Sequence, residues 1–278
     1  MTTAPDLAPA EAPIGVFDSG VGGLSVLREI HRLLPGEDLI YVADSGHAPY
    51  GDKPPAFVQA RAEHILRQLR RAGCKAVVVA CNTVTGLSIQ ALRAQHPGWP
   101  LVAIEPAVKP AAALTRSGVM GVLATRNTVA SPGLTRLIAE HAAGVQVLRQ
   151  ACPGWVERVE RGELDGPDTE TAVANRVQPL LDAGADVLVL GCTHYPFLLP
   201  VIQRIAGPSV AILDPAPAVA RELARRLTEA GLLNSRPRGG MVRFWTSGDL
   251  TQTGTVIARL WGSDTRPERL VEENTAES

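Results

Sequence analysis

Two cysteines each end an apolar run and are followed at once by polar residues. The first run is Val77-Val-Val-Ala-Cys-Asn-Thr83 and the second is Leu188-Val-Leu-Gly-Cys-Thr-His-Tyr-Pro196. A thiol with an ordinary pKa of about 8.5 donates a proton readily, and its thiolate accepts one. A single strand-end cysteine is more often a small buried apolar residue, but the duplicated setting favours chemistry. Cys81 and Cys192 could therefore exchange a proton across a carbon atom.

A glycine-rich segment, Asp18-Ser-Gly-Val-Gly-Gly23, follows an earlier apolar run. It is not a dinucleotide-binding motif, because Ser25 stands where that motif needs glycine or alanine. We expect a tight turn whose backbone N–H groups and Ser19 hydroxyl bind a small anion. Asp18 would act as a general base or as the partner of an ammonium group. Simple capping of the following helix by Asp18 is the alternative.

Two further polar features lie near apolar runs. His194 stands two residues after Cys192, where it could tune that thiol or protonate a substrate directly. The segment Pro49-Tyr-Gly51 supplies a rigid turn with free amides and a hydroxyl, which suit a carboxylate. Both features predict a site for a small polar molecule.

Length and composition agree with a small-molecule enzyme. A chain of 278 residues with 45% hydrophobic residues can form two modest domains. A formal charge of −1 gives no reason to expect nucleic acid as a partner. The first residues lack the features of a signal peptide, and no run is long enough to span a membrane, so we expect a cytoplasmic protein. Its four cysteines would then be thiols, and no pair has the Cys-x-x-Cys spacing of structural zinc.

Short runs rich in valine, isoleucine and leucine alternate with helical patterns, which predicts an α/β fold with parallel sheets. The expected strands are 14–17, 39–42, 76–80, 101–104, 119–123, 145–148, 186–190 and 210–213.

The order of apolar run, cysteine and helix occurs twice, which predicts two pseudo-symmetric parallel-sheet α/β domains. We expect residues 14–104 with 216–263 to form the first domain and 105–215 the second. Residues 1–13 and 264–278 are expected to be flexible tails. Because ligands bind beyond the carboxyl ends of parallel strands, the active site should lie in the cleft between the domains.

Several motifs, in this order, carry a resemblance to a known family. They are Asp18-Ser-Gly-x-Gly-Gly23, Pro49-Tyr-Gly51, Ala80-Cys-Asn-Thr83, Glu105-Pro106 and Gly191-Cys-Thr-His-Tyr-Pro196. The chain, from about residue 14 to 262, resembles the glutamate racemases of the aspartate/glutamate racemase superfamily. The resemblance implies an amino-acid racemase (an isomerase) that interconverts L- and D-glutamate without cofactor or metal. Its product would be D-glutamate for peptidoglycan synthesis.

The resemblance also implies roles for individual residues. Cys81 and Cys192 match the two catalytic thiols, with Asp18 and His194 as auxiliary acid/base groups. The family's acidic residue near the second cysteine aligns with Glu160, although Glu157, where proline is common, leaves the choice between the two open. The implied substrate-binding residues are Asp18, Ser19, Tyr50, Gly51, Asn82, Thr83, Thr125, Thr193 and His194. Glutamate is the expected small-molecule partner, and we expect a homodimer with no nucleic-acid or membrane partner.

Three alternatives stay open at the level of sequence. An aspartate racemase, or another enzyme of the superfamily, could use the same paired thiols. A dicarboxylate-binding protein would keep the cysteines inert. A Cys-His hydrolase would pair one cysteine with His194. A pyridoxal phosphate enzyme is disfavoured, because none of the three lysines, Lys53, Lys75 and Lys109, lies in a cofactor motif.

Overall fold

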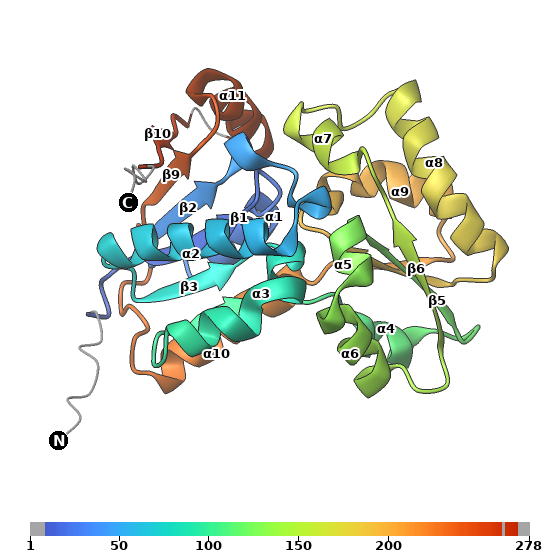
Figure 1. Ribbon diagram of the computed structural model, residues 1–278, viewed down its shortest axis with the longest axis horizontal. Helices are drawn as coiled ribbons and strands as arrows, with labels where there is room; N and C mark the ends of the chain where they lie inside the picture. Colours follow the sequence, from blue (N-terminus) through green and yellow to red (C-terminus); the bar gives the residue numbers. More distant parts are fainter. Residues whose placement is uncertain (1–8, 263–264, 272–278) are drawn as a thin grey trace.

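The protein is described by a computed structural model over residues 9–262 and 265–271, and the strands of these residues form two sheets (Figure 1). The first sheet holds β1 (Ile14–Asp18), β2 (Leu39–Ala43), β3 (Ala76–Val79), β4 (Leu101–Ala103), β9 (Val242–Thr246) and β10 (Glu268–Arg269). The second holds β5 (Val119–Ala124), β6 (Gln146–Ala151), β7 (Val187–Gly191) and β8 (Ala211–Leu213).

The two sheets share one strand order. The first runs β10-β9-β2-β1-β3-β4 and the second β6-β5-β7-β8, so the order β2-β1-β3-β4 in the first sheet corresponds to all four strands of the second. Every paired strand is parallel to its neighbour. The expected fold of two pseudo-symmetric parallel α/β units is confirmed. The eight expected strands are all observed, with ends that differ by one residue at most except that β6 ends three residues later, and β9 and β10 are additional.

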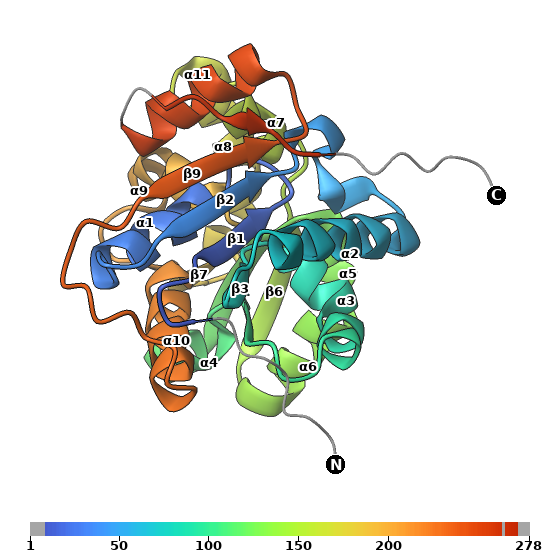
Figure 2. The same ribbon diagram turned by 90° about the vertical axis from the view of Figure 1, so that its left-hand side faces the viewer.

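Helices cover both faces of each sheet, as parallel strands require (Figure 2). Around the first sheet lie α1 (Leu24–Leu33), α2 (Pro55–Arg71), α3 (Asn82–Gln95), α10 (Ala216–Glu229) and α11 (Leu250–Trp261). The second half contributes α4 (Val108–Leu114), α5 (Arg126–Ala130), α6 (Pro132–His141), α7 (Trp155–Glu160), α8 (Pro167–Asp182) and α9 (Leu199–Ala206). The described residues also form the short 3₁₀ helices η1 (Ser45–His47), η2 (Tyr50–Asp52) and η3 (Tyr195–Leu198).

Strand β1 shows why its sequence is apolar throughout. Ile14 and Val16 face the core that contains α1 and α10, whereas Phe17 faces the core under α2. All three are fully buried, and each such side chain contributes about 1.5–3 kcal/mol by leaving water. Burial on both faces fixes the strand's position, and this fixes where Asp18, its last residue, must lie.

Strands β1 to β4 and β9 lie in the first sheet, and β5 to β8 lie in the second, which agrees with the expected domain boundaries. The division into these two domains stays our proposal. Much of the expected tails lies outside the described residues. The described part of the second tail differs from expectation, because β10 pairs with β9 and Leu270 is buried. Within the described residues, no helix combines the length and the apolar character needed to cross a membrane.

Candidate active site

The carboxyl ends of three strands bring the principal candidates together. Asp18 ends β1, Cys81 follows β3 after one residue, and Cys192 follows β7 directly. The structure buries all three. Burial raises the pKa of the Cys81 thiol, and negative charge on Asp18 and, to a smaller extent, on Cys192 raises it further. Asp18 lies 3.9 Å from Nδ1 of His194, which is 3.8 Å from the sulfur of Cys192, so this carboxylate also lies close to the second thiol.

Cys81 lies at the entrance of a helix. It is the N-cap residue of α3, so its sulfur is near the positive end of the helix dipole. Its Sγ lies 3.7 Å from the hydroxyl oxygen of Ser19, which is itself buried. The Ser19 hydroxyl and the helix amides stabilise a thiolate at Cys81, whereas burial and the negative charge of Asp18 destabilise it.

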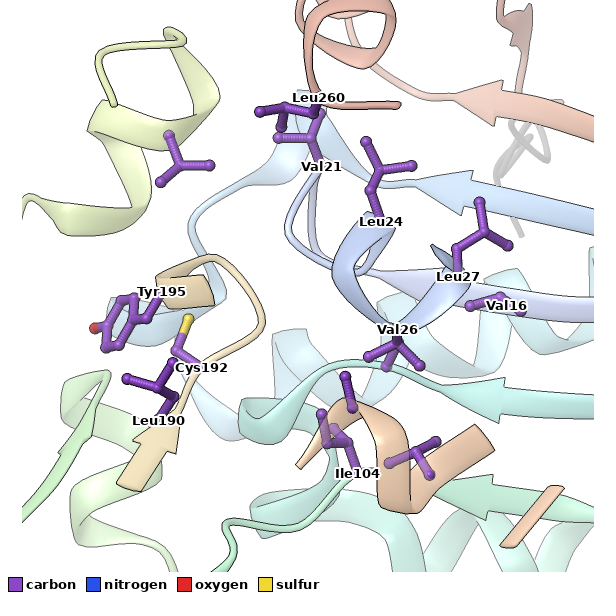
Figure 3. Packing of buried hydrophobic residues seen from close by; sticks show 14 of the residues in the cluster. Val16, Val21, Leu24, Val26, Leu27, Ile104, Leu190, Cys192, Tyr195 and Leu260 are labelled. Carbon is purple, nitrogen blue, oxygen red and sulfur yellow. The ribbon is translucent and has the colours of Figure 1, made fainter. Parts of the chain in front are cut away.

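Cys192 lies next to Tyr195 at the end of β7, where both side chains are buried (Figure 3). Its sulfur is 3.8 Å from Nδ1 of His194. The other ring nitrogen of His194, Nε2, lies 2.6 Å from Oε1 of Glu160. Burial acts to lower the pKa of His194, but its hydrogen bonds to Cys192 and Glu160 outweigh burial and raise the pKa well above its usual range. An imidazolium here would stabilise negative charge on the adjacent sulfur.

Glu160, rather than Glu157, is the acidic residue that contacts His194. It ends α7, and its two oxygens also bind the opposite half of the molecule. Oε1 accepts a hydrogen bond of 2.7 Å from the backbone N–H of Val21, and Oε2 accepts one of 3.0 Å from the Ser45 hydroxyl. Glu160 therefore links the two halves and orients His194 at the same time.

The glycine-rich turn after β1 binds an anion, but that anion belongs to the protein itself. The N–H of Val21 donates to Glu160, and the N–H of Gly23 donates to Oδ2 of Asp18 at 2.9 Å. A Cβ atom on Gly20 would overlap the Glu160 carboxylate, and one on Gly22 would lie 2.6 Å from Cε1 of His194. Glycine is needed in this turn because groups of the second half press against it. The sequence predicted the turn but not its occupant.

Asp18 connects both thiol neighbourhoods. Its Oδ2 also accepts a hydrogen bond of 3.2 Å from the Thr193 hydroxyl and lies 3.9 Å from Nδ1 of His194. Burial raises the pKa of Asp18, and His194 opposes that rise. The auxiliary acid/base groups of the two thiols are thus neighbours.

Threonine hydroxyls form a second cluster near Cys81. Thr83 lies 2.9 Å from Thr125 and 3.3 Å from Thr128, and these two are 3.0 Å apart, measured between Oγ1 atoms. Gly51 packs against this cluster, since a Cβ there would lie 2.7 Å from Cβ of Thr125. Sequence reasoning missed Thr128, although its spacing of three residues after a helix-capping threonine was available as a signal.

Asn82 offers the clearest sign of a polar ligand. It follows Cys81 directly and is buried, and among the described residues neither its Oδ1 nor its Nδ2 has a hydrogen-bond partner. Buried amides are normally satisfied, so an unsatisfied one beside a thiol suits a bound polar group. This agrees with its predicted role in substrate binding.

The Tyr50 hydroxyl differs from expectation. It was expected to face a carboxylate ligand, but it donates a hydrogen bond to Oδ2 of Asp44. Arg61 binds the same carboxylate through two bonds, Nε to Oδ2 at 3.0 Å and Nη2 to Oδ1 at 2.7 Å. The buried pair of Asp44 and Arg61 therefore holds the turn that carries Tyr50 and Gly51. The Tyr50 hydroxyl stabilises this turn instead of facing a ligand.

We expect Asp44→Asn to lower the free energy of unfolding by about 3 kcal/mol, because it removes one partner of a largely buried ion pair. Burial alone would raise the pKa of Asp44, but hydrogen bonds from Arg61 and Tyr50 lower it. A lowered pKa contributes stability above the usual aspartate range, and this is lost as the pH falls through the lowered value. Urea unfolding should show the full difference at pH 7 and a shrinking one below about pH 4.

Asp52→Asn on the same turn is the matched control. Its pair with Arg126 is 3.4 Å long and exposed, so the change should be within about 0.5 kcal/mol. Equal stability losses in the two variants would show that the Asp44 pair has no special role.

Among the described residues, no group of three or more histidine, cysteine, aspartate or glutamate side chains is arranged to hold a metal ion. The arrangement instead offers two thiols, each with an auxiliary carboxylate or imidazole. Such a site can remove a proton from one side of a carbon atom and supply one from another side. The fold and site together suit an enzyme that moves a proton at a carbon atom.

Comparison with known proteins gives the family. A family model described as Asp/Glu/Hydantoin racemase matches residues 14–223, and the chain belongs to this family. It is 53% identical over 250 residues to a glutamate racemase of Pseudomonas entomophila, covering 90% of this chain and 94% of that one.

Two solved structures are similar over nearly their whole length. A glutamate racemase from Francisella tularensis in complex with D-glutamate superposes with a TM-score of 0.84 at 28% identity, covering 96% of this chain and 99% of that one. An Escherichia coli glutamate racemase in complex with L-glutamate and the activator UDP-MurNAc-ala gives a TM-score of 0.82 at 33% identity, covering 93% and 98%. The resemblance inferred from the motifs is confirmed.

Proposed function

We propose that this protein is a glutamate racemase that interconverts L- and D-glutamate by two-base proton transfer at the α-carbon. The observation that carries the proposal is the placement of two buried thiols after corresponding strands of two sheets with one strand order. A pseudo-symmetric site suits a reaction whose substrate and product are mirror images. The similarity to glutamate racemases with L- and D-glutamate bound supports glutamate as the substrate.

In the proposed mechanism, one thiolate removes the α-proton and the opposite thiol returns a proton to the other face. The raised pKa of Cys81 favours its thiol form at neutral pH, which suits the donor. The sulfur of Cys192 lies 3.8 Å from Nδ1 of His194, a contact that suits proton exchange during base catalysis. The roles exchange for the other enantiomer.

Acid/base help of about 10²- to 10⁴-fold is too small by itself to ionise the α-carbon of an amino acid. Charge stabilisation in a buried site must supply the rest. The unsatisfied amide of Asn82 and the hydroxyl cluster at Thr83 and Thr125 are suited to bind the carboxylates, and Asp18 is suited to the ammonium group. We propose that the reaction needs neither cofactor nor metal.

Circular dichroism tests this function directly. L-glutamate incubated with dialysed, chelator-treated protein should lose its signal until equal amounts of both enantiomers are present, and D-glutamate should approach the same end point from the opposite sign. An unchanged signal with both enantiomers would rule out the function. Adding pyridoxal phosphate or divalent metal should not increase the rate.

The same assay separates the alternatives. Racemisation of aspartate at a rate above that of glutamate would favour an aspartate racemase. Tight glutamate binding by calorimetry without any change in dichroism would favour a binding protein. A covalent acyl-enzyme trapped with ester substrates would favour a hydrolase.

We further propose that the protein acts in the cytoplasm, where reducing conditions preserve its four free cysteines. Its product would supply D-glutamate for peptidoglycan, and its working form would be a homodimer. Light scattering coupled to gel filtration would test the dimer, since a monomeric mass at assay concentration would contradict it.

Gly22→Ala should reduce kcat by about 10²-fold, because displacing a catalytic group by about 1 Å has effects of this size. The added methyl group would collide with the imidazole of His194. The measurement is the initial rate in each direction, together with thermal unfolding of the same variant. Wild-type rates would show that the imidazole position is not critical.

A further inference from the structure

We propose that Cys192, His194 and Glu160 form a proton-exchange route to a neighbouring pocket large enough for water, through which the enzyme resets its thiols between turnovers. This proposal rests on the racemase function proposed above. It concerns what happens after product leaves, a step that two-base transfer requires but does not itself supply.

The need for a reset follows from the proton balance. When one enantiomer reacts, the thiolate that takes the α-proton becomes a thiol, and the opposite thiol becomes a thiolate. The free enzyme is then in the form that accepts the other enantiomer. A second turnover in the same direction requires one proton to leave the first sulfur and one to reach the second.

The contacts of Cys192 trace a path outward. Its sulfur is 3.8 Å from Nδ1 of His194, and Nε2 of His194 is 2.6 Å from Oε1 of Glu160. The side chain of His194 is only 1% exposed, whereas that of Glu160 is 17% exposed. Exposure therefore rises along the chain of contacts, from the thiol to the carboxylate.

Glu160 reaches a pocket of about 330 Å³ outside the thiol site. The pocket lies between α7, the loop at η1 and the start of α11, and its lining includes Ser45, Glu157 and Gln252. The lining includes several polar side chains, and this volume is large enough for water. Ser45 and the N–H of Val21 hold the Glu160 carboxylate in place from the opposite half.

Cys81 has a different setting. Its sulfur contacts the hydroxyl of Ser19, and both residues are buried. The series of side-chain contacts that leads to the pocket therefore starts at Cys192 and not at Cys81.

The proposed steps conserve protons. The Cys192 thiol gives its proton to Nδ1 of His194, and the proton on Nε2 moves to the Glu160 carboxylate. Glu160 then releases a proton to pocket water. The imidazole regains its first tautomer by exchanging its ring protons with water that enters as product leaves, so the same sequence can repeat in the next turnover. Cys81 gains its proton from water that enters as product leaves.

Glu160→Gln tests the route, because glutamine keeps the size and one acceptor oxygen but cannot carry the proton. The reset occurs in the free enzyme, so it limits kcat but not kcat/KM. We expect kcat to fall about tenfold or more in both directions, with a much smaller change in kcat/KM. Glu157→Gln, in the same helix and pocket, is the matched control and should keep wild-type kcat.

Countertransport gives a readout that a purely structural role would not move. Radiolabelled glutamate is first brought to equal amounts of both enantiomers, and a large excess of unlabelled L-glutamate is then added. If the reset is slow, most free enzyme accepts D-glutamate, so label moves transiently from D to L. We expect this excursion with Glu160→Gln and not with wild type or Glu157→Gln.

Glu160→Ala with formate provides a second test, because formate can bind the donors left by Val21 and Ser45. Formate should raise kcat of this variant in a concentration-dependent manner and leave wild type unchanged. The proton route would be overturned, and the racemase function kept, by one combined result. In that result the wild type is active, the Glu160 variants lose kcat and kcat/KM in parallel, and neither countertransport nor formate rescue is seen. A wild type that does not racemise glutamate would instead overturn the proposed function.

Discussion

Replacing either Cys81 or Cys192 with serine is expected to lower glutamate racemisation in both directions by at least about 10²-fold. Serine keeps a hydroxyl of similar size, but its pKa lies far above that of a thiol, so it cannot serve as the base. Each variant retains one thiol and should abstract the α-proton from one face alone. The rates are measured by circular dichroism from each pure enantiomer.

The surviving half-reaction identifies the face that each thiol serves. Substrates with a good β leaving group need only proton abstraction, so each variant should eliminate from one enantiomer only, and the two variants should choose opposite enantiomers. In deuterated water, the wild type should place deuterium at the α-carbon of the inverted product.

Cys74→Ser is the control for these variants. Cys74 is buried and precedes β3, at the opposite end of this strand from Cys81, so we expect it to have no part in proton transfer. The Cys74→Ser variant should racemise glutamate at the wild-type rate, provided that it folds. If Cys81→Ser and Cys192→Ser also retained wild-type rates, both cysteines would be structural and the two-base mechanism would be wrong.

Asp18→Asn and His194→Asn should each slow the two directions unequally, with the larger loss about 10²-fold. Negative charge on Asp18 acts on the pKa of Cys81, whereas His194 contacts the sulfur of Cys192. Removing Asp18 should therefore affect most the step in which Cys81 reacts, and removing His194 the step in which Cys192 reacts. Pre-steady-state rates from each enantiomer measure these steps.

The double variant supplies a sharper test. Asp18 and His194 are 3.9 Å apart, so their effects should be non-additive, as expected for groups in direct contact. Glu163→Gln provides a control, since its exposed pair with Arg161 lies outside this contact. Equal losses in both directions for each single variant would contradict the separate assignments.

The sequence by itself determined the parallel α/β fold and the positions of Asp18, Cys81 and Cys192. Apolar runs without alternation specify strands buried on both faces, and parallel strands present their carboxyl ends at one edge. A residue that directly follows such a run must therefore lie at that edge. The duplicated order of elements also predicted that two edges would contribute to one site.

The tertiary structure alone decided which groups serve those residues. Glu160 binds Val21 across 139 residues of sequence, and only this packing distinguishes it from Glu157. Likewise, the Tyr50 hydroxyl binds Asp44 rather than a ligand, and Thr128 meets Thr83 across 45 residues of sequence, a contact that its local spacing after Thr125 does not predict. Local periodicity determines where a strand ends, but a hydrogen bond between two halves of the chain depends on how those halves pack, because both partners must meet within about 3 Å.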